Sequence, residues 1–214
     1  GVAGGMQAGA RLIGVKGSVA GAARTLPLRL DLHRRMSIVS TRRPQRLGAV
    51  SGIFAIAAGI VGGAMERGWP SADDPAAVSA FINANGFAVL SQSAGFLISS
   101  AFYIAFFAGL CDALASRENG DRWLSSAAFG VSLVWVTLSM LAQGFQIGVA
   151  TAILHGVPAD EGLLWTLASV FGIVNLPAAA MLALVGAAIL RDHAFPAWLG
   201  WIALLVAISH ALLW

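Results

Sequence analysis

Five long apolar segments, separated by short polar ones, occupy most of the chain between Leu47 and Trp214. Each holds about 18 to 30 nearly uncharged residues, and a helix needs roughly 20 to cross a hydrocarbon core about 30 Å thick. Strands that are apolar on both faces cannot enclose the polar lumen of a barrel. The sequence therefore predicts an all-α, polytopic transmembrane helical bundle with five spans, at 47–65, 88–111, 124–153, 164–190 and 197–214.

The composition excludes an ordinary water-soluble domain. The 214 residues are 58% hydrophobic and 11% charged, whereas soluble chains carry about 25% charged residues. The aqueous segments are too short to hold a core of their own, so residues 36–214 are expected to form one membrane domain. The single cysteine, Cys111, rules out an internal disulfide and a cysteine-rich metal site.

Residues 1–35, called the leader below, differ from the rest of the chain. They contain six basic residues and one acid, a net charge of +5 that leaves −2 for residues 36–214. The basic balance therefore belongs to the leader and does not indicate nucleic-acid binding. We expect the leader to be disordered or to precede a true start at Met36, with an organellar transit peptide as the alternative. The final apolar run ends at Trp214 without a polar tail, so truncation of the sequence at its C-terminus is an alternative.

The arginines predict how the chain is threaded through the membrane. Basic residues precede the first span, lie between the second and third, and follow the fourth, whereas the opposite side has Arg67 alone. This asymmetry places the N-terminus in the cytoplasm and the C-terminus outside. One lysine against twelve arginines, with abundant alanine and glycine, indicates a GC-rich bacterial genome and hence a bacterial inner membrane.

The one sizeable outer segment, 66–86, contains the signals of a short helix. Asp73 or Asp74 can cap a helix whose first position is Pro75, and Gly86 can end it. Val78, Phe81 and Ile82 would share one face. We expect this helix to lie on the outer surface of its own bundle or in the headgroup layer, and a partner-binding helix is the alternative.

Small residues and one proline predict the packing of the spans. Ser51, Ala55, Gly59 and Gly63 form a stripe at four-residue spacing, which allows close helix approach inside the monomer or, alternatively, at a homo-oligomer or partner-subunit seam. Pro177 should kink the fourth span, because its ring clashes with the carbonyl of residue 173 and removes one helical hydrogen bond.

Neutral polar residues mark the candidate site inside the membrane. No Asp, Glu, Lys or Arg lies well inside a span, which argues against a proton-coupled pump. Gln92, Gln143 and Gln146 fall in the outer half of the membrane and Asn175 near its middle, where they would converge on a polar pocket that opens outward. The alternative is hydrogen bonding between helices, worth about 0.6 kcal/mol per pair.

Enzyme signatures are missing from the sequence. It has no His-Glu-x-x-His motif, no Gly-x-Ser-x-Gly elbow and no Walker-type phosphate loop. We therefore predict no catalytic residue, cofactor or bound metal. His155 and His210 lie at outer span ends on the same side, which leaves a bis-histidine haem as a minor alternative.

Two segments carry a resemblance to a known family. Arg46-Leu-Gly-Ala-Val-Ser-Gly-Ile-Phe opens the first span, and Asp74-Pro-Ala-Ala-Val-Ser-Ala-Phe-Ile lies in the outer segment. Together with the span that follows, which begins with polar residues, they resemble the bacterial multispan membrane proteins grouped as domain of unknown function 4386. The resemblance covers residues 43–213 and implies a membrane fold, commonly of six helices, without an activity or site residues.

The expected function is a membrane-embedded binding, accessory or sensor subunit that contacts the lipid bilayer and holds a small apolar or neutral ligand from the outer side. A permease-like transporter for a small neutral solute is the first alternative. A haem- or quinone-binding subunit of a membrane oxidoreductase is the second.

Overall fold

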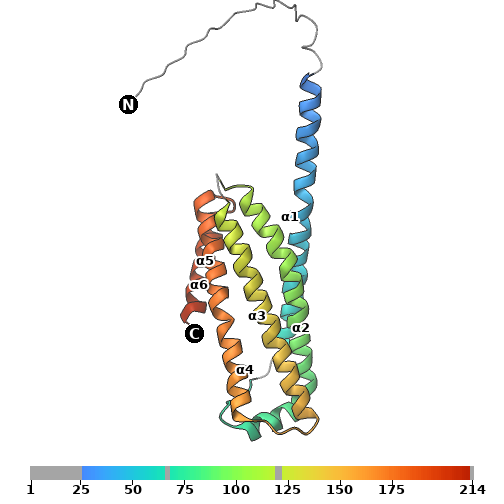
Figure 1. Ribbon diagram of the computed structural model, residues 1–214, viewed down its shortest axis with the longest axis vertical. Helices are drawn as coiled ribbons and strands as arrows, with labels where there is room; N and C mark the ends of the chain where they lie inside the picture. The colour runs from blue at the N-terminus through green and yellow to red at the C-terminus, as the bar shows by residue number, and fades with distance from the viewer. Residues whose placement is uncertain (1–25, 66–67, 119–121, 213–214) are drawn as a thin grey trace, which may run out of the picture. The chain divides into compact units, whose positions relative to one another are not determined.

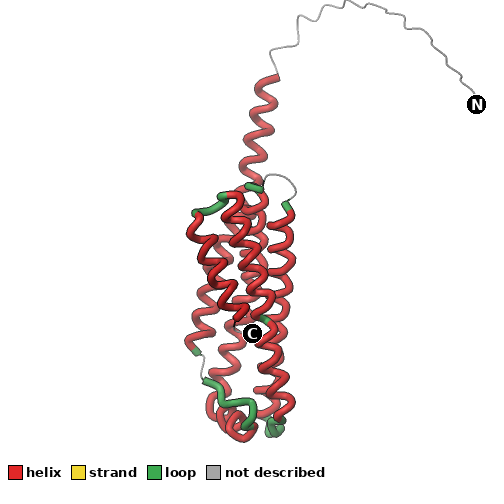
Figure 2. Tube along the Cα trace, turned by 90° about the vertical axis from the view of Figure 1, so that its left-hand side faces the viewer, coloured by secondary structure: helices red, strands yellow, loops and turns green. Residues whose placement is uncertain are grey.

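The computed structural model describes residues 26–65, 68–118 and 122–212, and side chains from residue 45 onward. Six helices and no strand are found in these ranges (Figures 1 and 2), which confirms the all-α prediction. They are α1 (Leu26–Ala64), α2 (Pro75–Ala115), α3 (Trp123–Leu154), α4 (Glu161–Ile173), α5 (Asn175–Asp192) and α6 (Ala197–Leu212).

The chain divides into two units, residues 1–40 and 41–214, and the bundle described below is the second. Most of the predicted leader, residues 1–25, lies outside the described residues, and α1 already begins at Leu26.

Four helical segments are long and apolar enough to cross a membrane, as expected of a multi-pass protein. They are Gln45–Ala64, Pro75–Ala115, Trp123–Leu154 and the combined α4–α5 segment, Glu161–Asp192. The fifth predicted span corresponds to α6, which has 16 residues and is about 24 Å long at 1.5 Å per residue. Large apolar side chains such as Ile53, Phe87 and Trp201 point away from the bundle, which is compatible with contact with lipid.

Helix α3 occupies a central place in the bundle. It packs against α2, α4 and α5, and α6 packs against α5. The connections gather at two ends (Figure 1). We call them the Trp69 end, with the segments 68–74 and 155–160, and the Arg122 end, with the segments around Arg122 and 193–196.

Apolar clusters fill the bundle near both ends and leave a polar level between two of them. At the Trp69 end, Val89 of α2 and Val149 of α3 belong to one cluster, and Phe107 and Val136 of the same helices belong to another. Between these levels the two helices enclose a polar belt, which consists of Gln92, Ser93, Ser99, Ser100, Ser139, Gln143 and Gln146. The candidate site lies in this belt.

The start of α2 agrees with two predictions, the cap at Asp74 and the end of a first helical segment near Gly86. Asp74 caps the helix, since its Oδ1 accepts a hydrogen bond of 2.9 Å from Ala77 N, and Pro75 is the first helical residue. The predicted end at Gly86 is close to the structure, because α2 consists of two helices joined across a kink at Asn85, and the second of them continues to Ala115. At Asn85 α2 bends (φ −122°, ψ 15°), and the Asn85 amide donates to the Phe81 carbonyl at 3.0 Å. A side chain on Gly86 would come within 2.9 Å of Leu154, so this glycine permits close packing.

The fourth span is divided near Pro177, where a kink was predicted, although Val174 at the division keeps α-helical backbone angles (φ −59°, ψ −28°). The fourth span is interrupted at Val174, between α4 and α5, three residues before the proline. The first hydrogen bond across the break, from Ala178 N to the Val174 carbonyl, is long at 3.4 Å. This is the place where the pyrrolidine ring removes the donor for the carbonyl of residue 173.

The small-residue stripe of α1 lies in a different register from the predicted one. Ala55 is fully buried, and the Ser99 hydroxyl of α2 donates to its carbonyl at 2.7 Å. Gly63, however, is exposed, and a side-chain carbon at this position would have no neighbour within 4 Å. The contacts with α2 are made at residues 48, 52, 55, 59 and 62. A spacing of four residues rotates by about 40° per step, whereas alternate steps of four and three stay on one face.

Candidate functional site

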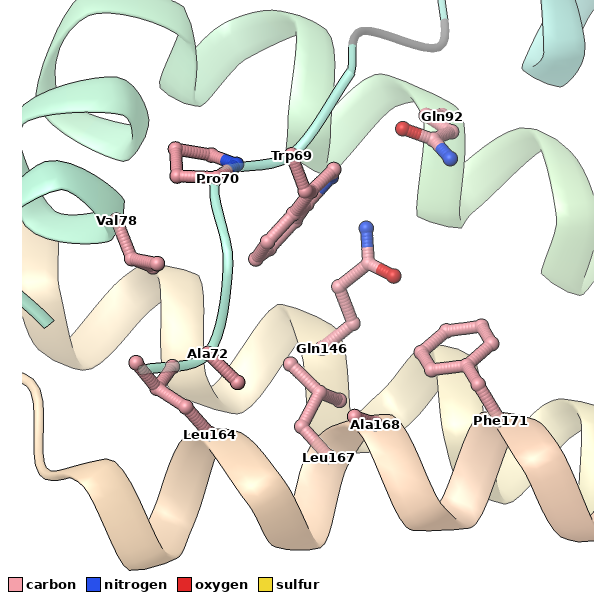
Figure 3. Close-up of a pocket in the computed structure, with 10 residues that line it drawn as sticks. All are labelled: Trp69, Pro70, Ala72, Val78, Gln92, Gln146, Leu164, Leu167, Ala168 and Phe171. Atoms are coloured by element: carbon pink, nitrogen blue, oxygen red, sulfur yellow. The ribbon is translucent and has the colours of Figure 1, made fainter. Parts of the chain in front are cut away.

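A cavity of about 270 Å³ lies near the Trp69 end and is called the outer cavity below. Helices α2, α3 and α4 and the segment 68–74 supply its walls (Figure 3). Its lining residues are Trp69, Pro70, Ala72, Val78, Gln92, Gln146, Leu164, Leu167, Ala168 and Phe171. The polar side-chain groups in this lining are the two glutamine amides and the indole N–H of Trp69. None of the lining residues is charged.

The two glutamine amides enter this cavity from facing helices. Gln92 comes from α2 and Gln146 from α3, and Figure 3 shows both amides in the space beside the Trp69 indole. Both residues are almost completely buried, with exposed fractions of 7% and 4%. Their place between the apolar cluster at the Trp69 end and the next level of the core fixes them at a depth where bulk water does not compete for their hydrogen bonds.

Each amide has one atom that is fully buried and has no hydrogen-bond partner among the described residues. These atoms are Oε1 of Gln92, an acceptor, and Nε2 of Gln146, a donor. An unsatisfied buried polar group costs about 1–3 kcal/mol. Because rotating an amide by 180° exchanges its oxygen and nitrogen, the pair offers both kinds of group in either orientation. The cavity can therefore recognise a molecule that both donates and accepts.

The remaining walls are apolar and partly formed by the segment 68–74. Leu164, Leu167 and Phe171 of α4 form one side. Trp69 packs against Phe81 of α2 with ring centroids 5.6 Å apart, which anchors the indole over the cavity. A concave, mostly apolar space with a few convergent polar groups is the usual form of a small-molecule site.

The structure brings together two of the four predicted polar residues. Gln143 of α3 lines a different cavity, between α1, α2 and α3. Asn175 accepts a hydrogen bond at the α5–α6 contact, where its Oδ1 lies 3.1 Å from Nδ1 of His210. Gln143 and Gln146 are three residues apart, so they leave the helix in directions about 60° apart and can face different spaces.

Three serines at seven-residue spacing on α3 donate their hydroxyl protons within their own helix. Ser125, Ser132 and Ser139 each donate to a carbonyl of the preceding turn, at 3.1, 2.7 and 2.8 Å. This local bonding competes with interhelical bonds, as is common for serine within helices.

The two histidines considered for haem have separate partners. Nδ1 of His155 lies 2.8 Å from the Thr151 carbonyl of its own helix, and His210 contacts Asn175. Across the described part of the chain, no group of three or more His, Cys, Asp or Glu residues is placed to hold a metal ion.

Sequence reasoning missed the contribution of Trp69 and Phe171 to the cavity. The apolar face of Val78 and Ile82 predicts that the start of α2 packs on the bundle, but no pattern in the segment 68–74 predicts that its indole turns inward.

No protein-family model, curated protein or solved structure matches this chain. The interpretation of the site therefore depends on its own geometry and chemistry.

Proposed function

We propose that this protein is a non-enzymatic binding or sensor subunit of a bacterial inner membrane, which holds a small neutral ligand in the outer cavity. Its N-terminus would face the cytoplasm, in line with the arginine distribution, so that the Trp69 end faces outward. The observation that carries the proposal is the pair of buried, incompletely bonded amides of Gln92 and Gln146 in an otherwise apolar cavity. Membership of the family of domain of unknown function 4386 is likewise a proposal and adds no site residue.

The lining of the cavity defines the class of ligand. A charged molecule would lose its hydration without gaining a counter-ion, because no lining residue is charged. A fully apolar molecule would leave both amides unsatisfied. The best match is a small neutral molecule with an apolar body and one group, such as a carboxamide or an alcohol, that both donates and accepts hydrogen bonds.

Small molecules that co-purify with the protein in mild detergent provide the test. Mass spectrometry of the extract should identify a neutral compound that is retained by the wild type and by Gln143→Leu. The compound should be lost from the double variant Gln92→Leu/Gln146→Leu. Gln143→Leu is the matched control because it removes the same amide from the same helix without touching the outer cavity. Retention of every such compound by the double variant would contradict the proposal.

A permease for a small neutral solute is the second candidate. The observation that favours it is the course of the polar belt, which continues from Gln92 along the α2–α3 contact to Ser100. The test is solute flux into proteoliposomes. Flux that is present with the wild type and falls to the level of empty vesicles with the Gln92→Leu/Gln146→Leu variant would favour transport of the ligand over simple binding.

A further inference from the structure

A second cavity, of about 420 Å³, lies between α1, α2 and α3 and is called the central crevice below. It is lined by residues near the middle of the spanning segments, at 56–60 of α1, 96–103 of α2 and 135–143 of α3. Two of them, Ile56 and Ile60, are 56% and 66% exposed on α1. In a membrane this exposed rim contacts lipid, so the crevice is open to molecules dissolved in the bilayer.

The floor of the central crevice is polar. Gln143 lines the crevice and is only 8% exposed. Its Oε1 has neither accessible surface nor a hydrogen-bond partner among the described residues, and rotating the amide by 180° turns this oxygen toward the crevice in place of Nε2. Ser99 and Ser139 already donate their hydroxyl protons to backbone carbonyls, at 2.7 and 2.8 Å. Neither can therefore serve that oxygen at the same time. At mid-membrane there is no bulk water to replace a partner, so an acceptor in this place is costly unless a ligand donates to it.

Aromatic side chains and further hydroxyl-bearing residues line the same crevice as Gln143. Tyr103 and Trp135 meet edge to face, with ring centroids 5.3 Å apart and an interplanar angle of 69°. The hydroxyl groups of Tyr103 and Ser100 line the same crevice. No charged residue does. The crevice thus combines flat apolar surfaces with hydroxyl groups and one buried acceptor.

We propose that the central crevice binds a neutral, ring-bearing, lipid-soluble alcohol or phenol that enters from the bilayer. The hydroxyl of the ligand donates to Oε1 of Gln143, which rotation of the amide by 180° turns into the crevice. The oxygen of the same hydroxyl can accept from Tyr103 or Ser100. The ring packs against Trp135, where aromatic contacts add to the gain from burial.

The depth of the crevice decides against the commonest alternative occupant. A phospholipid carries its polar groups at the membrane surface, so only its acyl chain would reach residues in the middle of the spans. An acyl chain fills volume but donates no hydrogen bond to Gln143. A hydroxylated ring supplies both the apolar body and the donor. This site is separate from the outer cavity, and the proposal does not depend on the function proposed above.

Side-chain amide resonances provide a residue-resolved test. The chain has five glutamines, so a protein labelled with ¹⁵N only at glutamine and reconstituted in lipid nanodiscs gives a simple spectrum. Single Gln→Leu variants, or Gln→Asn where Leu impairs folding, assign each pair of signals. The probe is 1-naphthol, and 1-methoxynaphthalene is its matched control, since the ether has the same rings but no hydroxyl proton.

We expect 1-naphthol to shift the Gln143 amide signals saturably, with little change at Gln146. The methyl ether should bind at least about tenfold more weakly, because a tenfold change corresponds to one hydrogen bond of about 1.4 kcal/mol. Tyr103→Phe and Ser100→Ala, tested together, should weaken naphthol binding several-fold without moving the Gln146 signals.

Three results would overturn the proposal. Equal shifts from both probes would show that the crevice takes any apolar molecule, such as an acyl chain. An unshifted Gln143 signal at saturating 1-naphthol would show that the crevice does not bind this class. Shifts at Gln92 and Gln146 alone would place the probe in the outer cavity, which would leave the proposed function intact while refuting the second site.

Discussion

Nδ1 of His210 lies 3.1 Å from Oδ1 of Asn175, so a hydrogen bond joins the last turn of α6 to the first residue of α5. The imidazole must carry its proton on Nδ1 to donate to the amide oxygen. The contact lies beside the break at Val174, where Pro177 has weakened the backbone ladder. The pair therefore ties α6 to the junction between α4 and α5.

The energy of this contact can be measured with a double-mutant cycle. His210→Leu, Asn175→Leu and the double variant should give a coupling free energy of about 0.6 kcal/mol, typical of hydrogen bonds between membrane helices. Reversible unfolding in mixed micelles is the measurement. Ser209→Ala is a control, because Ser209 donates to the Val206 carbonyl of its own helix. A coupling energy of zero would mean that the two side chains do not interact.

Two glycines of α1 should respond oppositely to alanine. A side-chain carbon on Gly48 would lie 2.8 Å from Cα of Gly109, so Gly48→Ala forces the backbones of α1 and α2 apart and should cost about 1–3 kcal/mol. Gly63 has nothing within 4 Å, so Gly63→Ala should be neutral or stabilise the helix by up to about 1 kcal/mol. Unfolding measurements on both variants test the packing register, and similar losses would contradict it.

The cap of α4 should contribute measurably to stability. Asp160 Oδ1 accepts a hydrogen bond of 3.0 Å from Leu163 N, and loss of such a cap costs about 1 kcal/mol. We expect Asp160→Ala to lower the free energy of unfolding by this amount and Asp160→Asn to lower it less. Glu161→Ala, in the next position, removes a carboxylate without removing the cap bond. If both alanine variants were equally destabilised, charge rather than capping would be responsible.

Replacing Pro177 should straighten the fourth span. Pro177→Ala restores a backbone donor for the carbonyl of residue 173, so the break at Val174 should close. Spin labels on the exposed positions Thr166 and Arg191, one in α4 and one in α5, would report the change. We expect their distance to increase relative to the parent, measured by pulsed electron paramagnetic resonance after Cys111 is replaced by Ala. An unchanged distance would assign the bend to packing against α3 and α6.

The proposed orientation predicts which connections a membrane-impermeant maleimide can reach. Ser71 and Ser116 are both exposed and lie at opposite ends of the bundle. In intact cells Ser71→Cys should be labelled and Ser116→Cys should be labelled only after permeabilisation, again in a Cys111→Ala background. The reverse pattern would invert the topology, and labelling of both would mean that the two segments do not lie on opposite sides.

Local rules were sufficient wherever one residue decides the outcome. The apolar lengths predicted the spans, Asp74 and Pro75 predicted the start of α2, and Pro177 predicted the break before α5. In each case the cause acts within one helical turn, so the sequence alone contains it.

Rules of spacing were insufficient wherever two helices must meet. The predicted stripe of α1 drifted off the contact face at Gly63, although the glycines at 48, 52, 59 and 62 were visible in the sequence. The first helical segment of α2 ends at Asn85, next to the predicted Gly86, but the sequence did not predict that Gly86 is also needed for the close approach of Leu154 of α3. For the candidate site, the prediction placed four polar residues together because their depths in the membrane were similar. Their directions around each helix axis, which tertiary packing sets, separated Gln143 and Asn175 from the pair in the outer cavity.

Because α3 is one uninterrupted helix from Trp123 to Leu154, Gln143 and Gln146 are held on a common rod about 4.5 Å apart along its axis. If α3 rotates so that one glutamine amide binds its ligand more tightly, the direction of the other glutamine amide changes as well. Occupancy of the two sites would then be thermodynamically linked, and linkage is reciprocal. A lipid-borne molecule beside Gln143 would tune the affinity for a ligand beside Gln146 by the same factor as the ligand tunes the affinity for the lipid-borne molecule.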